Sequence, residues 1–192
     1  MASHFYSMLF RMKNIFRWGL MRNTRRESLS EHSLEVACIA HALALIRNKR
    51  FGGKVDTGAV VTTALYHDAT EIITGDMPTP IKYYSDGIKN AYKQIESEAC
   101  NNLLQLLPED LREEYRPLME CKDPEIKELV KAADKLAAYI KCIEETNMGN
   151  HEFDVALKST QDILNSCTTP EVKVFMEEFM PGFHMSLDEQ KL

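Results

Sequence analysis

Apolar residues recur at helical spacing along most of the chain, and no segment shows the two-residue alternation of a β-strand. The segment from Ser30 to about Asn48 carries two adjoining apolar stripes, so we predict a helix that is central to the fold, with Ser30 as its N-cap. One stripe holds Leu34, Ala37, Cys38, His41, Ala44 and Leu45, and the other holds His32, Val36, Ile39, Leu43 and Ile46. In this arrangement we expect His41 to be a core residue.

Turn-forming residues divide the remainder of the chain into further helices. An Asp-Pro pair at Asp123 is a strong start signal and Gly149 is a suitable stop, so we predict one long helix that runs to about Met148. The other predicted helices run from Asp56 or Thr57 to the region of Glu71–Thr74, from about Asp86 to Leu107, after Pro108, and over residues 150–167 and 170–180. Prolines restrict themselves and their predecessors, so residues 76–80 are expected to form a rigid, non-helical loop.

These elements predict an all-α protein of roughly six to eight helices in a single domain that spans residues 1–192. The length suits one domain, and the shares of 44% hydrophobic and 27% charged residues are typical of a soluble globular chain. No signal peptide is recognisable, and the most apolar stretch, residues 36–46, is far shorter than the ~20 residues of a membrane span. We therefore expect a cytoplasmic protein without a membrane partner.

The five cysteines are widely scattered, are odd in number and form no Cys-x-x-Cys pair. This pattern suits neither a complete disulfide framework nor a zinc knuckle. We therefore expect reduced thiols, most of them buried, in a cytosolic protein.

The net charge of −6 argues against nonspecific binding to nucleic acid, yet the charge is unevenly distributed. Residues 1–26 contain no acidic residue, and their basic residues are Arg11, Lys13, Arg17, Arg22, Arg25 and Arg26. A local basic patch on an acidic protein suits a small anionic ligand such as a phosphate. For most of these arginines a solvated or dimer-facing surface is a better explanation than a direct ligand contact, and an organellar transit peptide has a similar composition.

Several polar residues occupy positions where a predicted helix should be apolar. His32 heads one apolar stripe, His67 and Asp68 follow the apolar run 59–66, and Asp134 lies on the inner line of its helix. A buried, unpaired carboxylate is energetically expensive, so Asp134 needs a cation, a hydrogen-bonding partner or a metal. Each residue taken alone has a simpler explanation, since a lone histidine on an apolar face is more often a satisfied core residue than a ligand.

Taken together, two imidazoles and two carboxylates on three inner helix faces form a suitable coordination shell for one divalent ion. Mixed histidine and aspartate ligation suits Co²⁺, Mn²⁺, Fe²⁺ or Zn²⁺, whereas Mg²⁺ and Ca²⁺ prefer more oxygen ligands.

The order His32, His67-Asp68, Asp134 resembles the signature of HD-domain phosphohydrolases. Five further blocks in their order resemble the bacterial 5′-deoxynucleotidase family, and the similarity extends over nearly the whole chain, including the N-terminus. The blocks are Arg17–Asn23, Ser30–Leu34, Tyr66–Glu71, Thr74–Pro80 and Phe183–Glu189. This resemblance implies an HD-type helical bundle with the metal site between its central helices, and a homodimer.

By the same resemblance, His32, His67, Asp68 and Asp134 bind one metal ion, with Co²⁺ or Mn²⁺ foremost. Such an ion lowers the pKa of bound water to about 7 and so provides hydroxide at neutral pH. Glu71 shares a face with Asp68 if their helix continues, and its carboxylate is then placed to position the attacking water or to shuttle its proton.

The resemblance also implies the contacts to a deoxynucleoside 5′-monophosphate. Arg17 is expected to clamp the phosphate through its planar guanidinium. Trp18 is expected to contact the substrate as well, whereas without the family resemblance we would assign it to packing. The proline-stiffened loop from Asp76 to Thr79 is expected to hold the sugar and to exclude a 2′-hydroxyl sterically. The implied substrate-binding residues are Arg17, Trp18, His32, Asp68, Asp76, Met77, Pro78, Thr79 and Asp134, and the implied catalytic residues are Glu71, Arg17 and Asp68.

Three functions are therefore weighed. The first is hydrolysis of deoxynucleoside 5′-monophosphates to deoxynucleosides and phosphate. The second keeps the metal site but acts on a triphosphate, a cyclic nucleotide or an alarmone, for which the chain has little additional apparatus. The third is a non-catalytic scaffold that binds nucleotide or nucleic acid, against which the complete ligand set, Glu71 and the acidic net charge all argue.

Overall fold

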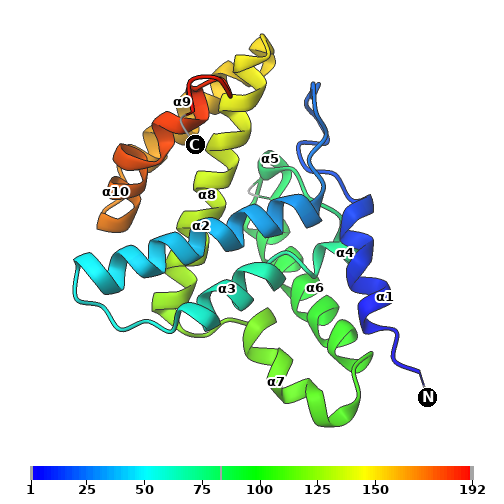
Figure 1. Ribbon diagram of the computed structural model, residues 1–192. Helices are drawn as coiled ribbons and strands as arrows, with labels where there is room; N and C mark the ends of the chain where they lie inside the picture. The colour runs from blue at the N-terminus through cyan, green and yellow to red at the C-terminus, as the bar shows by residue number, and fades with distance from the viewer. Residues whose placement is uncertain (1, 83, 191–192) are drawn as a thin grey trace.

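The computed structural model describes residues 2–82 and 84–190, and within them the protein is built from helices alone (Figure 1). The α-helices are α1 (Phe5–Leu9), α2 (Leu29–Arg50), α3 (Thr57–Tyr66), α4 (Glu71–Thr74), α5 (Thr79–Lys82), α6 (Asp86–Gln105), α7 (Glu109–Met119), α8 (Pro124–Asn147), α9 (Asp154–Asn165) and α10 (Pro170–Glu178). Three 3₁₀ helices are η1 (Phe10–Asn14), η2 (His151–Phe153) and η3 (Met180–His184). The only β-pairing in the described residues is an isolated antiparallel bridge between Phe16 and Ser28. The predicted all-α class is confirmed.

The described residues hold ten α-helices, more than the six to eight expected, because α1, α4 and α5 are single turns of four or five residues. Such short pieces are too brief to show a helical period. Helices α3 and α8 begin where the sequence signals placed them: Asp56 caps α3, and Asp123 caps α8 with Pro124 in its first turn. Gly149 follows α8 with a positive φ of 79°, the backbone conformation that glycine favours at a helix end.

Helix α2 starts two residues earlier than predicted, because its N-cap is Ser28 and not Ser30. The Ser28 hydroxyl accepts a hydrogen bond from the Glu31 N–H, and the Glu31 carboxylate accepts one from the Ser28 N–H at 2.8 Å, which is a capping box. This reciprocal pair satisfies two backbone donors, whereas Ser30 lies within the first turn.

One apolar stripe on α2 faces the core, and of the other stripe only Ala37 and Ala44 do. Val36 and Leu43 are fully buried, whereas Leu34 is 60% exposed on the opposite side. The expectation that His41 is a core residue is wrong, since it lies on this exposed face with Cys38 and Leu45. Helix α2 packs mainly against α3 and α8, and these two partners cover one side of it (Figure 1).

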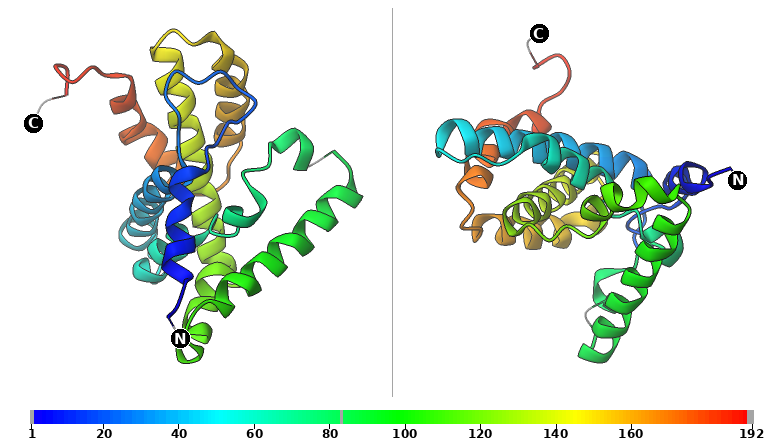
Figure 2. Two further views of the ribbon diagram at one scale, coloured as in Figure 1. Left: turned by 90° about the vertical axis from the view of Figure 1, so that its right-hand side faces the viewer. Right: turned by 90° about the horizontal axis from the view of Figure 1, so that it is seen from below.

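Two apolar clusters meet at the first turns of α2. The larger cluster unites α2, α3, α8 and α10 around residues such as Val36, Leu43 and Leu136. The smaller joins α1 and α6 to Leu29 and Ala69. Figure 2 shows α6 diverging from the bundle that contains α2 and α8, whereas α7 packs against α3.

The helix predicted to continue through His67 is interrupted there. Helix α3 ends at Tyr66, and residues 67–70 form turns in which the Ala69 N–H bonds to Tyr66 O and the Glu71 N–H bonds to Asp68 O. Helix α4 then restarts at Glu71. The side chains of 67, 68 and 71 are therefore placed by a turn and not by one helical face.

The proline-rich loop is shorter than expected. Residues 75–78 are non-helical, but Thr79 and Pro80 open the helical turn α5, because a proline is tolerated in a first turn that needs no backbone donor. The side chain of Thr79 lies outside the described part of the structure.

Helix α2 is long and apolar enough to cross a membrane by length and composition, with a mean hydropathy of 1.3 over its best window. However, 56% of that window is buried inside the fold, as in the core helix of a soluble protein. All five cysteines are unpaired, but the expectation that most are buried is wrong. Cys100 and Cys142 are buried, whereas Cys38 and Cys167 are exposed.

Candidate metal and active site

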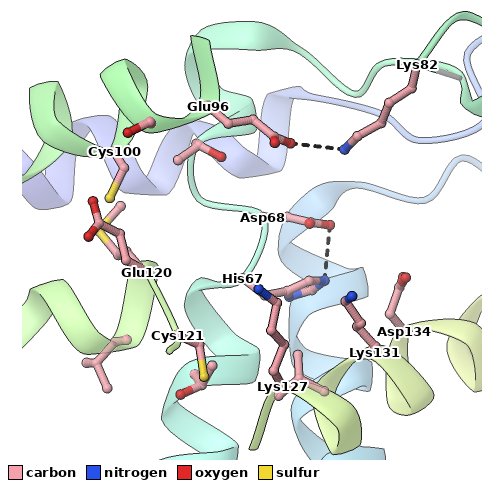
Figure 3. Close-up of a pocket in the computed structure, with 16 residues that line it drawn as sticks. His67, Asp68, Lys82, Glu96, Cys100, Glu120, Cys121, Lys127, Lys131 and Asp134 are labelled. Carbon is pink, nitrogen blue, oxygen red and sulfur yellow. Dashed lines mark hydrogen bonds and ion pairs between the residues drawn. The ribbon is translucent and has the colours of Figure 1, made fainter. Parts of the chain in front are cut away.

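Three of the four predicted metal ligands converge where the two apolar clusters meet. One donor atom each from His32, His67 and Asp68 lies within 4.8 Å of the others. His32 is on the first turn of α2 and is completely buried, and the other two occupy the turn after α3. His67 Nε2 and Asp68 Oδ2 are 3.2 Å apart, and Figure 3 shows these two side chains turned toward each other.

Both imidazoles are oriented through Nδ1, which leaves Nε2 for the site. His67 Nδ1 lies 2.7 Å from the carbonyl oxygen of Ala64. His32 Nδ1 lies 2.9 Å from Oε1 of Glu27, a close ion pair that is not aligned as a hydrogen bond. A histidine that ligates a metal commonly has its second nitrogen held by a carbonyl or carboxylate in this way.

The fourth predicted ligand, Asp134 on α8, lies beside this group but outside its tightest set. Asp134 Oδ1 is 3.2 Å from His32 Nε2, and its side chain is 27% exposed. Asp68 Oδ2 is 3.6 Å from the same nitrogen. The carboxylates of α8 and of the turn after α3 therefore face one buried imidazole from two sides.

The shifted pKa values of the site indicate that it stabilises positive charge. Burial lowers the pKa of His67, but Asp68, Asp134 and the Ala64 carbonyl together outweigh this effect and raise the pKa to about 9. Burial raises the pKa of Asp134, but His32, Lys135 and Arg17 together lower it by more, so the net shift is downward. Carboxylates that stabilise charged imidazoles also stabilise a bound divalent cation, and its binding displaces those protons.

The donor set fits a divalent metal ion. Nε2 of His32 and Nε2 of His67 are both buried and make no aligned hydrogen bond within the described residues. Unsatisfied buried nitrogens are expensive in a low-dielectric interior, and coordination to a metal satisfies them directly. Two imidazoles with carboxylates match the ligand preference of Co²⁺, Mn²⁺, Zn²⁺ or Fe²⁺.

Arg17 lies against three carboxylates of the site. Its Nε is 3.4 Å from Glu27 Oε1, one terminal nitrogen is 3.4 Å from Asp68 Oδ2, and the other is 3.7 Å from Asp134 Oδ1. Burial lowers the pKa of Arg17, but Asp134, Glu27 and Asp68 raise it by more. The guanidinium is therefore a fixed positive charge at the edge of the donor group.

Glu71 is a buried carboxyl, 8% exposed, whose Oε2 has no hydrogen-bond partner in the part of the chain that the structure describes. Burial raises its pKa to about 9, with further contributions from Asp68 and Asp76. A carboxyl group with so high a pKa holds a proton at neutral pH and is suited to transfer it. The prediction that Glu71 and Asp68 share one helical face is wrong, because Asp68 lies in the turn at 67–70 and helix α4 begins only at Glu71.

Trp18 has a left-handed backbone, with φ of 58°, which is uncommon for a bulky residue. Its indole Nε1 donates a hydrogen bond to Glu27 Oε2 at 2.9 Å, and its ring packs on Phe153 at a centroid distance of 5.3 Å. Burial raises the pKa of Asp76, an effect that Arg17 and the Trp18 backbone N–H reduce. Arg17, Trp18 and Asp76 are thus brought together as predicted, whereas Met77 and Pro78 are half-buried in the loop.

A cavity of about 540 Å³ opens beside the donor group, between α8 and the arm formed by α6 and α7. His67, Asp68 and Asp134 line one side, and Lys127 and Lys131 of α8 point toward them (Figure 3). The described lining does not include the predicted substrate residues Arg17, Trp18, Asp76, Met77 or Pro78.

Sequence reasoning missed Glu27, Lys127 and Lys131. Glu27 is the first acidic residue after an acid-free stretch of 26 residues, and that isolation was a usable signal. Lys131 lies three residues before Asp134 and Lys127 four residues earlier, so all three share one face of α8. Neither lysine has an ion-pair partner within the described ranges, and both add positive charge to the cavity.

Of the basic N-terminal residues, Arg17 alone is found at the site. Arg22 pairs with Glu152, Arg25 pairs with Glu31, and Arg26 lies over the ring of Phe16. The segment is therefore held against the folded chain through its own contacts.

Comparisons with known proteins agree with this geometry. A family model described as 5′-deoxynucleotidase YfbR-like matches residues 4–183. A 5′-deoxynucleotidase from Photorhabdus laumondii is 48% identical over 192 residues, which cover 99% of this chain and 98% of the relative. The 5′-deoxynucleotidase YfbR of Escherichia coli is 49% identical over 189 residues, which cover 97% of this chain and 95% of the relative.

Solved structures share the fold. An HD-domain phosphohydrolase from Listeria innocua is similar with a TM-score of 0.81 and 25% identity, over 94% of this chain and 88% of its own. The cyanophage S-2L HD phosphohydrolase DatZ, bound to dA and one catalytic Zn²⁺ ion, is similar in fold with a TM-score of 0.63 and 18% identity, over 92% and 96% of the two chains. The predicted HD-type architecture is confirmed.

Proposed function

The chain belongs to the YfbR-like 5′-deoxynucleotidase family, and from this premise we propose that residues 1–192 form one HD domain in which His32, His67, Asp68 and Asp134 hold a single divalent metal ion. The protein is an enzyme that hydrolyses deoxynucleoside 5′-monophosphates to deoxynucleosides and phosphate.

The observation that carries the metal proposal is the convergence of donors from His32, His67 and Asp68 within 4.8 Å, with each imidazole anchored at Nδ1. We assign Co²⁺ or Mn²⁺ as the working ion, and the same donors also accept Zn²⁺ or Fe²⁺. The bound ion supplies Lewis acidity and lowers the pKa of water to about 7. We assign Asp68 a catalytic role because its carboxylate faces both His67 and Arg17.

Arg17 orients the phosphate of the substrate and offsets its charge. Its planar guanidinium matches phosphate geometry, and its contacts with Glu27, Asp68 and Asp134 fix it beside the donor group. Lys127 and Lys131 add mobile positive charge to the neighbouring cavity, which favours a phosphate-bearing ligand over a neutral nucleoside.

Glu71 carries the proton of the reaction. The new bond forms between the water oxygen and phosphorus, and the bond between phosphorus and O5′ breaks. Glu71 Oε2 is the atom we assign to give its proton to the departing O5′, since a raised pKa of about 9 keeps the carboxyl protonated at neutral pH, and the carboxylate that remains takes up the proton of the water.

Trp18 and the loop from Asp76 to Thr79 hold the nucleoside. Asp76 lies close enough to the Trp18 backbone for its N–H to lower the carboxyl pKa, so the two enclose one region. We assign the exclusion of a 2′-hydroxyl to this enclosure, and His32, Asp68 and Asp134 complete the substrate contacts at the phosphate end.

The enzyme acts in the cytoplasm as a homodimer. The outer face of α2 supports this assembly, because Leu34 is 60% and Leu45 is 40% exposed and Cys38 lies between them. Two-fold dimers are the commonest oligomers, and an exposed apolar stripe is a typical contact. Light scattering after gel filtration should give twice the 22.0 kDa chain mass, and Leu34→Glu should reduce it to one chain.

The test of substrate and sugar is phosphate release from metal-loaded protein on matched pairs, dAMP with AMP and dCMP with CMP. We expect release from the deoxy member of each pair. Equal release from both members would contradict the sugar assignment to Trp18 and Asp76. Release from dATP or a cyclic nucleotide but from no monophosphate would contradict the substrate class.

A further inference from the structure

Glu27 is a buried carboxylate at the start of α2 that contacts three residues of the proposed site. Its side chain is 7% exposed and lies immediately before the N-cap of α2. It is the residue at which the segment carrying Arg17 and Trp18 returns to the bundle, since the Arg17 N–H bonds to Glu27 O at 3.0 Å. A buried carboxylate at such a junction needs positively charged or hydrogen-bonding partners, and the partners of Glu27 belong to the proposed site.

The two carboxylate oxygens of Glu27 serve different residues. Oε1 lies 2.9 Å from His32 Nδ1 and 3.4 Å from Arg17 Nε. Oε2 accepts the indole hydrogen bond of Trp18 at 2.9 Å. One side chain thus contacts a metal ligand, the phosphate-orienting arginine and the nucleoside-binding tryptophan.

The contact with His32 decides which nitrogen is available to the metal. A carboxylate oxygen 2.9 Å from Nδ1 favours the proton on that nitrogen electrostatically, and the Nε2 atom is then the one that faces Asp68 and Asp134. A carboxylate in this position also makes the imidazole a stronger ligand.

The contact with Trp18 holds a strained residue. The left-handed φ of 58° is disfavoured for a bulky side chain and persists only where surrounding contacts impose it. The indole hydrogen bond to Glu27 and packing on Phe153 are two such contacts, and the Trp18 carbonyl also accepts hydrogen bonds from the Asn23 amide and the Met21 N–H.

We propose that Glu27 is a positioning residue that couples metal binding at His32 to the placement of Arg17 and Trp18, so that the metal and the nucleotide each favour the geometry the other needs. This inference rests on the metal site of the proposed function. When the metal fixes the His32 ring, Glu27 is fixed with it, and through Glu27 so are the guanidinium and the indole.

The test uses the single tryptophan of the chain as a reporter, because its fluorescence then describes Trp18 alone. Zn²⁺ is added to chelator-stripped full-length protein, and its affinity is measured by competition with a colorimetric chelator while emission is recorded. Glu27→Gln keeps the size but removes the charge. Glu31→Gln is the matched control, because Glu31 lies at the same helix end and glutamine retains the capping box.

We expect Glu27→Gln to weaken Zn²⁺ affinity by about 10- to 100-fold, as is usual for a residue that orients a metal ligand. The emission change that Zn²⁺ causes in the wild type should disappear in this variant and persist in Glu31→Gln. The KM for dAMP should rise as well, since Arg17 and Trp18 lose their common partner.

Trp18→Phe provides a second variant in case Glu27→Gln does not fold. It removes only the indole donor, so Zn²⁺ affinity should fall by about 2- to 10-fold, as for one hydrogen bond. Tight Zn²⁺ binding in wild type, Glu27→Gln and Trp18→Phe alike would overturn the coupling while leaving the metal site intact. A wild type that takes up no divalent ion at all would overturn the proposed function and this inference together.

Discussion

Two buried charge clusters border the segment from Arg17 to Ser28, and they differ in how far their polar atoms are satisfied. The anchor cluster consists of Thr24, Lys141, Glu145 and Asn150, and the donor cluster consists of His32, His67, Asp68 and Asp134. In the anchor cluster, the fully buried Glu145 accepts hydrogen bonds from the Thr24 N–H, the Thr24 hydroxyl, the Arg25 N–H, the Asn150 amide and the Lys141 ammonium. In the donor cluster, Nε2 of both histidines has no aligned hydrogen bond within the described residues.

This difference suggests a structural role for the anchor cluster and a ligand-binding role for the donor cluster. A saturated network makes one geometry rigid and has no capacity left for a ligand. A network with unsatisfied polar atoms destabilises the metal-free protein, and a bound cation can satisfy those atoms. The anchor cluster therefore fixes the segment that carries Arg17 and Trp18, and the donor cluster is where we propose that a metal ion and substrate bind. The predictions below test this division, beginning with the largest effect.

Removing a donor should eliminate function altogether. Asp68→Ala takes away a carboxylate that faces His32, His67 and Arg17, so we expect neither retained metal nor phosphate release above background. Metal content by mass spectrometry and phosphate release from dAMP measure the two losses. Asp162→Ala, an exposed aspartate on α9, is the control and should match the wild type.

Removing the proton carrier should separate activity from metal binding. Glu71→Ala and Glu71→Gln should each lose about 10²- to 10⁴-fold in kcat, the usual contribution of a positioned acid or base. Both variants should keep one metal ion per chain. A Glu71→Ala enzyme with wild-type kcat would show that Glu71 has no part in proton transfer.

Removing the guanidinium should affect turnover somewhat less. Arg17→Ala should lower kcat by about 10²- to 10³-fold, because the phosphate loses a fixed positive charge in the transition state. Arg22→Ala is the matched control from the same basic segment, and its partner Glu152 lies outside the donor cluster. Equal kcat in the two variants would place Arg17 outside the reaction.

Breaking the anchor cluster should cost stability and leave the metal site able to bind. Glu145→Gln should lower the free energy of unfolding by about 1.5–3 kcal/mol, the range for hydrogen bonds to a charged group, with metal affinity retained. Burial raises the pKa of Glu145, but Lys141, Thr24 and Asn150 lower it by more, to below its ordinary 4.5. Its stabilisation is therefore complete above pH 4.5 and declines as the pH falls further.

Denaturant unfolding at several pH values checks this expectation. The difference between wild type and Glu145→Gln should be constant from pH 7 down to about pH 5 and should shrink towards pH 3. A difference that grows on acidification would show that the carboxylate does not act as a charged acceptor in the folded state.

The sequence predicted the helical class, the start of α3 and both ends of α8 with little error, because Asp56, Asp123 and Gly149 are local signals that act through nearby backbone groups. It also grouped His32, His67, Asp68 and Asp134, since polar residues on apolar faces are conspicuous. It did not find the break after Tyr66, where no proline or glycine marks the turn. Nor could it separate the two stripes of α2, because His41 sits in an apolar context that only packing resolves.

Glu27 was missed for a different physical reason. Its role depends on the fold-back of the preceding segment, which the bridge between Phe16 and Ser28 closes. Contacts of this kind join residues by tertiary geometry, so no periodicity reveals them. The catalytic roles proposed for Glu71 and Arg17 came from family resemblance, and their positions beside Asp68 are what the structure adds.

The most direct measurement is a titration of chelator-stripped enzyme with Co²⁺ or Mn²⁺ while phosphate release from dAMP is followed. If the donor cluster is a single-ion catalytic centre, the rate should rise from background in proportion to added metal and level off at one ion per chain. Full activity in the stripped enzyme, or a plateau that requires two ions, would contradict that assignment.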